Sequence, residues 1–88
     1  MNETYTLTQR LTALEKARAV VEILRSRAET MIPAELPRCR ARRREYLVRH
    51  LQDGFPALSH PMIGRLIRVE QSTVARIVAR MRKAGRTT

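Results

Sequence analysis

Cysteine and glycine are scarce in this sequence, and each shortage excludes a class of protein. The 88 residues include one cysteine, three glycines and no tryptophan. A lone cysteine excludes an internal disulfide and fits a reducing cytoplasm. The glycines are scattered, so no glycine-rich loop is present to cradle the phosphates of a nucleotide. A disulfide-stapled secreted domain and a P-loop enzyme are therefore both excluded.

Long apolar runs are also missing. No stretch approaches the ~20 residues that a membrane-spanning helix requires. The first ten residues, MNETYTLTQR, have neither the basic start nor the apolar run of a secretory leader. We therefore expect a cytoplasmic protein that makes no contact with a membrane.

Side chains suited to catalysis or metal binding do not form a recognisable pattern. The sequence has no paired carboxylates and no nucleophile with a matching base. Cys39, His50 and His60 have a spacing that matches no standard set of metal ligands. We expect a protein that is not an enzyme and that holds neither a metal nor a cofactor.

Acidic residues are almost missing from the second half of the chain. Residues 1–37 hold five basic and five acidic side chains, whereas residues 38–88 hold thirteen basic and three acidic ones. The second half therefore carries the whole formal charge of +10. Twelve of its thirteen cations are arginine, whose planar guanidinium suits bidentate contacts with phosphates and base edges. This asymmetry predicts a polyanionic partner, with nucleic acid first and an anionic membrane surface second. The arginine-rich segment lacks the Trp/Phe/Leu face of an interfacial helix, which weighs against the membrane.

Residues 7–31 are predicted to form one long amphipathic helix. Thr6 or Thr8 is suited to cap its start, and Pro33 and Pro37 in the connector IPAELP end it. Apolar residues recur in the segment at spacings of three and four, which is the period of a helix with one buried face. The stripe consists of Leu11, Leu14, Val21, Leu24 and Ala28, widened by Ala17, Val20 and Ile23.

Three shorter helices are predicted in the basic half, over residues 38–52, 61–67 and 72–83. Gly54 is expected to supply left-handed geometry after the first of them. Ser59 or His60 is suited to cap the second, and the third is expected to stop before Gly85.

No strand pattern appears, so the predicted fold class is all-α, with four helices in a single domain. Its parts are an N-terminal helix with its connector (1–37), a basic helix followed by a helix pair (38–84) and a flexible tail (85–88).

The last two predicted helices have the spacing of a helix-turn-helix. Gly64 lies where the helices approach closely and a side chain would clash, and Val69 in the turn is placed to fill the gap between them. Val74 and Ile77 anchor the second helix to the core. The opposite face then presents Gln71, Ser72, Thr73, Arg76 and Arg80. A second helix that offers such residues to base edges is how this motif reads the major groove.

The motif can be matched to a known family. Residues 59–65, SHPMIGR, resemble the S-x-P-x-I-G-R stretch that opens the helix-turn-helix in the C-terminal DNA-binding domain of DnaA-type replication initiators. Ser72, Thr73 and Val74 match the paired hydroxyls and valine that follow there. The preceding basic helix is similar too, so the resemblance covers residues 38–84. It does not extend to an ATPase domain, and it implies DNA binding through residues 72–83 as the recognition helix.

Two differences limit what the resemblance implies. The family has a Gly-Gly turn followed by an Arg-Asp-His run that reads bases. Here the turn is Arg68-Val69, one residue shorter, and Glu70 and Gln71 follow it. Gly64 to Ile77 also fits the helix-turn-helix of bacterial repressors without a gap. Both alignments predict the same fold, and neither carries over the initiator's own DNA site.

Arginines ahead of the motif are the predicted backbone contacts. By analogy with the family, those at the start of residues 38–52 would lie along phosphates or enter the minor groove. Narrow minor grooves concentrate negative potential and attract arginine, which supports the same assignment independently. These candidates are Arg38, Arg40, Arg42 and Arg43, and Arg68 in the turn joins them as a further DNA contact.

The sequence thus predicts a nucleoid-associated protein that binds double-stranded DNA and regulates replication or transcription in a bacterium or a phage. The alternative is a protein–protein adaptor, built on a helix-turn-helix scaffold, whose basic face holds an acidic partner. The N-terminal helix either closes the domain's own core or presents part of its wide apolar stripe to a second copy or another protein. The second interpretation leaves homodimerisation open.

Overall fold

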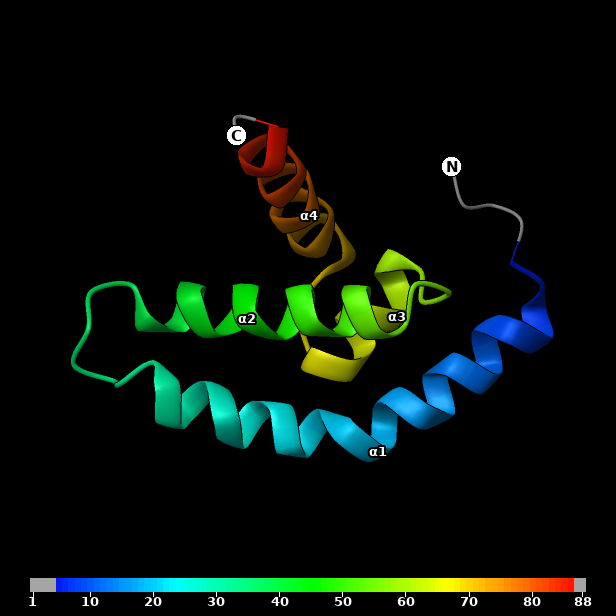
Figure 1. Ribbon diagram of the computed structural model, residues 1–88, viewed down its shortest axis with the longest axis horizontal. Helices are drawn as coiled ribbons and strands as arrows, with labels where there is room; N and C mark the ends of the chain where they lie inside the picture. The colour runs from blue at the N-terminus through cyan, green and yellow to red at the C-terminus, as the bar shows by residue number, and fades with distance from the viewer. Residues whose placement is uncertain (1–4, 87–88) are drawn as a thin grey trace.

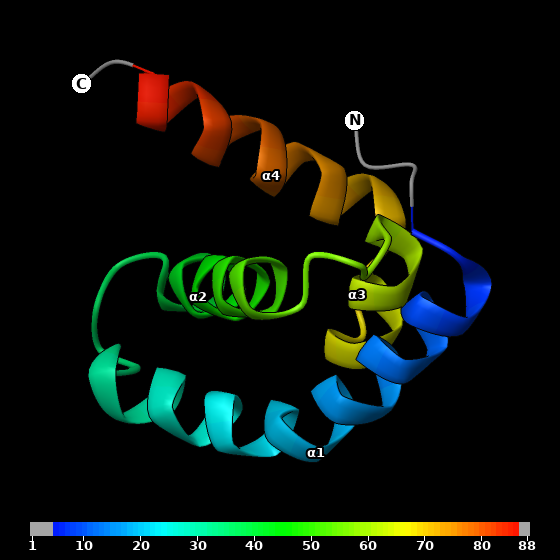
Figure 2. The same ribbon diagram turned by 45° about the vertical axis from the view of Figure 1, so that its right-hand side comes forward.

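Four α-helices follow one another in the computed structural model, which describes residues 5–86. They are α1 (Leu7–Met31), α2 (Cys39–Gly54), α3 (His60–Ile67) and α4 (Gln71–Arg86). The described residues contain no strand, so the predicted all-α fold with four helices is confirmed. Figures 1 and 2 show α2 between α1 on one side and α4 on the other, while α3 packs against all three.

The core forms where the four helices meet. Leu51 of α2, Ile63 of α3 and Ile77 of α4 are among its largest fully buried side chains. Burying an aliphatic side chain of this size contributes about 1.5–3 kcal/mol, so these few residues supply much of the stability of so small a domain. The core residues from α1 are Ala17, Val21 and Leu24. The N-terminal helix therefore closes the domain's own core. This is the first of the two roles that the sequence suggested for it.

The start of α1 is fixed by its cap. Thr6 is the N-cap, and its Oγ1 accepts a hydrogen bond of 3.1 Å from the backbone N–H of Gln9. The Gln9 side chain accepts a return bond of 2.8 Å from the backbone N–H of Thr6. This reciprocal pair is a capping box, which satisfies two amides that the first turn leaves without helical partners. Of the two predicted caps, Thr6 is the one that the fold uses.

Part of the predicted apolar stripe of α1 does not reach the core. Leu11 is 49% exposed and Ile23 is 53% exposed, although both were expected on the buried face. The buried residues of α1 are Ala17, Val21, Leu24 and Ala28, whose spacing of three and four places them on one helical face. Leu11 precedes this section by more than a turn, and Ile23 lies beside the face rather than on it. A helix of 25 residues is longer than the small core that it covers.

The turn after α2 does not use glycine as predicted. Gly54 is the last helical residue of α2, and none of the glycines in the described residues has a positive φ. The left-handed positions are instead Arg38, with φ 60°, and Arg68, with φ 62°. Arg38 is the N-cap of α2, so the helix begins one residue later than predicted and extends to Gly54.

Gly64 is required where α3 turns into α4. A Cβ atom added at Gly64 would lie 2.6 Å from the backbone oxygen of Val69, which is too close for any real Cβ contact. The Val69 N–H also donates a hydrogen bond of 2.9 Å to the Gly64 oxygen. The prediction of a close approach at Gly64 is confirmed, and the obstacle is the backbone of the connection rather than the facing helix. Val69 is half-buried against the core, as its predicted filling role requires.

Both ends of the helix pair differ slightly from the sequence prediction. Ser59 is the N-cap of α3, but its side chain makes no capping hydrogen bond. α4 begins at Gln71 and continues through Gly85 to Arg86, so the predicted stop before Gly85 is wrong. The rest of the predicted flexible tail, residues 87–88, lies outside the described residues. Within the described part of the chain, no helix is long and apolar enough to cross a bilayer.

Candidate nucleic-acid interface

The arginine-rich first half of α2 presents two different sets of side chains to its neighbours. Residues three or four apart share a helix face, and a shift of two residues is slightly more than half a turn. Arg38, Arg42 and Glu45 therefore share one face, and Arg40 and Arg44 lie on the opposite one. The hollows described below agree with this division, because each set lines a different hollow.

The first set faces α4. Arg38, Arg42 and Glu45 line a hollow of about 180 Å³ together with Arg80 from the middle of α4. We call this surface the α4-side face and define it as these four residues with Arg76, which is one helical turn from Arg80. Two segments that are far apart in the sequence thus place their arginines side by side. The sequence predicted each half of this surface but gave no reason for them to meet.

An ion pair joins the two halves of the α4-side face. Nη2 of Arg80 lies 3.5 Å from Oε2 of Glu45, and the two side chains are 58% and 43% exposed. Exposed pairs of this kind contribute at most about 1 kcal/mol, since water and salt screen them. The pair is therefore easily exchanged for a contact between Arg80 and an external anion.

The start of α4 carries the predicted base-reading residues. Gln71, Ser72 and Arg76 are exposed, as expected for side chains on an outward face. Thr73 is only half-buried, and its backbone N–H donates a 3.0 Å hydrogen bond to the oxygen of Glu70. On the opposite side of α4, Val74 and Ile77 are buried, as predicted. The exposed polar side chains therefore occupy the face that is turned away from the core.

The second set on α2 faces α1 and the connection between α3 and α4. Arg40, Arg43 and Arg44 line a hollow of about 310 Å³, which Arg25 of α1 and Arg68 of the connection complete. We call it the α1-side hollow. Of the arginines predicted to bind DNA, Arg40, Arg43 and Arg68 thus lie together, apart from Arg38 and Arg42.

Arg43 has a structural role that the sequence did not indicate. Its Nε donates a 2.8 Å hydrogen bond to the backbone oxygen of Ile32, and its Nη2 donates a 3.4 Å bond to that of Glu29. These carbonyls belong to the C-terminal end of α1, where helices lack internal donors and the dipole favours a cation. Arg43 therefore caps α1, and its donors are directed into the fold rather than toward an external phosphate.

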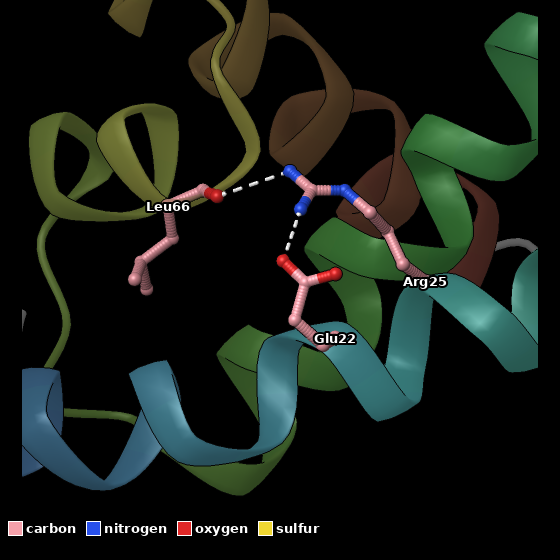
Figure 3. Close-up of polar contacts among 3 residues, drawn as sticks. All are labelled: Glu22, Arg25 and Leu66. Atoms are coloured by element: carbon pink, nitrogen blue, oxygen red, sulfur yellow. Dashed lines mark hydrogen bonds and ion pairs between the residues drawn. The ribbon is translucent and has the colours of Figure 1, made fainter.

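Arg25 has a similar structural role on the other side of the same hollow. Its Nη2 donates a 3.3 Å hydrogen bond to the oxygen of Leu66 near the end of α3, and its Nη1 lies 2.7 Å from Oε2 of Glu22 (Figure 3). The guanidinium thus ties α1 to α3. Arg25 was missed as a member of the arginine cluster because it comes from the charge-balanced half of the chain. Arg44 belongs to the arginine run that the sequence singled out, but it was not among the predicted DNA contacts, although its four-residue spacing from Arg40 was a usable signal.

Within residues 5–86, no three histidine, cysteine, aspartate or glutamate side chains gather closely enough to hold a metal ion.

Comparisons of the chain with protein-family models, with curated proteins and with solved structures found no match. The resemblance to DnaA-type initiators therefore stays a prediction.

Proposed function

We propose that this chain binds double-stranded DNA through a helix-turn-helix formed by α3 and α4, with α4 as the recognition helix. The observation that carries the proposal is the α4-side face, where Arg38 and Arg42 of α2 lie beside Arg80 of α4. A recognition helix needs flanking cations to fix its position on the duplex, because phosphate contacts position a protein and base contacts give it specificity. The α4-side face thus offers Arg38 and Arg42 for phosphates on the same side of the molecule as Arg76, which we propose reads a base.

The exposed residues of α4 match the chemistry of base edges in the major groove. Arg76 is suited to guanine and Gln71 to adenine, since both pairings are bidentate. Ser72 and Thr73 are able to bond phosphates or several base groups. Gly64 supports the same assignment, because its missing side chain lets α4 begin close against α3.

Regulation of replication or transcription in a bacterium or a phage is the cellular role that we propose for this activity. The resemblance of residues 59–65 to DnaA-type initiators supports it. Under this proposal the protein acts by occupying DNA and is not an enzyme.

A second candidate is the adaptor that binds an acidic protein. The ion pair between Arg80 and Glu45 favours it, because the α4-side face already accepts a carboxylate. The two proposals differ in sequence preference. A DNA reader selects a site from random duplexes, whereas an adaptor's basic face binds every duplex weakly and equally.

The test is an unbiased selection of duplex sites by the purified chain, followed by titrations of two variants. Arg76→Ala is expected to weaken binding to the selected site by about 1–3 kcal/mol and to leave binding to random duplex nearly unchanged. Arg42→Ala is expected to weaken both by similar factors. All titrations are made at one salt concentration.

Arg27→Ala is the matched control for Arg42→Ala. Arg27 is exposed on α1, which lies on the other side of α2 from α4, and it lines neither of the two hollows described above. It is expected to change neither titration by more than about twofold, since the exposed charge is outside the α4-side face. If selection yields no preferred site, or if Arg76→Ala weakens both duplexes equally, base reading by α4 is wrong and the adaptor becomes the leading function.

A further inference from the structure

The α1-side hollow collects more positive charge than the fold compensates. Five arginines line it, from α1, α2 and the connection before α4, and Glu29 is the one acidic residue among its lining side chains. Like charges held this close repel each other, and the repulsion is stronger near buried apolar side chains than in water. Leu47 and Ile67 supply such an apolar surface in the same wall.

Two of the five arginines are fixed by the fold and three are not. Arg25 and Arg43 donate to backbone carbonyls at the ends of α3 and α1. Arg40, Arg44 and Arg68, by contrast, have no side-chain hydrogen bond or ion pair with another residue of the described chain. Their donors are therefore free to bind a partner outside the chain, and their shared charge favours an anion.

We propose that the α1-side hollow binds a compact anion that carries at least two phosphate groups. A guanidinium binds a phosphate through two parallel hydrogen bonds, which makes arginine the residue of choice for such groups. Arg40 and Arg44 lie one turn apart on α2, and Arg68 comes from the separate segment between α3 and α4, so guanidinium groups line the hollow from two segments. A volume of about 310 Å³ is at the lower end of small-molecule pockets and fits a short polyphosphate.

The phosphates have two possible sources. One is a free small molecule with a polyphosphate group, and the other is a pair of neighbouring phosphates in a nucleic-acid backbone. The hollow lies on the face of α2 opposite to the α4-side face, which favours the free molecule. The proposal does not rest on DNA binding, because the residues that carry it include none that we assign to base reading.

The first arm of the test uses the full chain without DNA. Inorganic tripolyphosphate and orthophosphate are titrated separately by calorimetry at constant ionic strength. Tripolyphosphate is expected to bind one to one, about tenfold or more tightly than orthophosphate, since several guanidinium groups act on one molecule. Backbone amide shifts in NMR spectra are expected at the hollow, in residues 67–69 and 40–47.

Two double variants that remove the same charge from different places test whether tripolyphosphate binds in the α1-side hollow. Arg40→Gln combined with Arg44→Gln is expected to weaken tripolyphosphate binding about tenfold or more, which corresponds to at least about 1.4 kcal/mol. Arg18→Gln combined with Arg27→Gln removes the same charge from exposed positions of α1 that line neither basic surface, and it is expected to change tripolyphosphate binding by less than about threefold. Arg68→Asn provides an independent variant, because asparagine tolerates the left-handed backbone at this position. Thermal melts confirm that each variant is folded.

The second arm separates the two sources with a random duplex. If saturating tripolyphosphate leaves duplex binding unchanged, the hollow takes a free polyphosphate. If duplex binding is lost with tripolyphosphate and also with the Arg40 and Arg44 double variant, but not with its control, backbone phosphates fill the hollow. Absence of one-to-one binding in the first arm, or equal weakening by both double variants, would overturn the proposal. Failure to bind DNA would leave it standing.

Discussion

Two arginines adopt a left-handed backbone conformation that the sequence did not predict. Arg38 and Arg68 both have positive φ, which is uncommon for a residue with a Cβ and costs roughly 1 kcal/mol. Each lies at a helix boundary, one before α2 and the other after α3. Arg38 lines the hollow of the α4-side face and Arg68 lines the α1-side hollow, so each basic surface contains one left-handed residue.

Gly64 and Gly54 form a matched pair for testing the α3–α4 connection. Gly64→Ala is expected to lower the free energy of unfolding by about 1–3 kcal/mol, because its Cβ would lie 2.6 Å from the backbone oxygen of Val69. Gly54→Ala meets nothing within 4 Å and lies in a helix, so it is expected to be neutral or stabilising by up to about 1 kcal/mol. Thermal melts followed by circular dichroism measure both. Equal melting temperatures would mean that the close approach at Gly64 is not required.

The sequence correctly predicted the role of Gly64 and wrongly predicted that of Gly54, because the two glycines differ in how much the local sequence constrains them. Gly64 is surrounded by apolar residues at helical spacing, and a glycine within such a pattern indicates that a backbone comes close. Gly54 follows a helix, where a left-handed residue is common but not obligatory. Whether a helix continues for two more residues depends on what the next segment packs against, and local sequence does not contain that information.

At the scale of helices, α2 is the element that organises the molecule. Its buried residues Leu47, Val48 and Leu51 contact the core, while its first half divides the arginines between the α4-side face and the α1-side hollow. The sequence identified the cluster as a single set, because consecutive arginines look alike in a linear string. Helical period divides them between two faces of α2, and the positions of α1 and α4 on either side of α2 decide what each face meets.

The joint between α1 and α2 depends on Arg43 in a way that can be measured. Arg43→Gln is expected to lower the free energy of unfolding by about 1–2 kcal/mol, because the two carbonyl groups at the end of α1 lose a charged donor. Arg42→Gln is the control, since Arg42 is exposed and its side chain makes no hydrogen bond in the described structure. Urea titrations of both variants give the comparison. If the two midpoints shift equally, Arg43 does not cap α1.

The apolar stripe of α1 illustrates what periodicity cannot determine. The pattern correctly predicted an amphipathic helix from residue 7 to residue 31, with Val21 and Leu24 buried. It also predicted burial of Leu11 and Ile23, which are exposed. Helical period shows which residues share a face, but the extent of burial depends on the size of the surface opposite. The homodimer that this exposed apolar area would allow stays a prediction.

The whole molecule separates its charge by helix. α1 contributes to the charge-balanced first 37 residues, whereas α2 and α4 carry most of the excess of +10. A field of this kind raises the rate and affinity of binding to any polyanion and is screened by salt. Total charge alone therefore does not distinguish a specific interface from general attraction. Charge changes of equal size at different places are needed for that distinction.

Glu45 and Asp53 provide such a comparison, because both are acidic residues of α2. Glu45 pairs with Arg80 on the α4-side face, whereas Asp53 is exposed and lines a different hollow with Arg82. Glu45→Gln is expected to tighten duplex binding about threefold to tenfold at low salt, because Arg80 is released for phosphate and a repulsive charge is removed. Asp53→Asn raises the net charge equally and is expected to have a smaller effect. The difference between the variants should shrink as salt rises toward about 1 M, where the screening length falls to about 3 Å. An equal gain from both substitutions would show that DNA responds only to net charge and would remove the α4-side face as the interface.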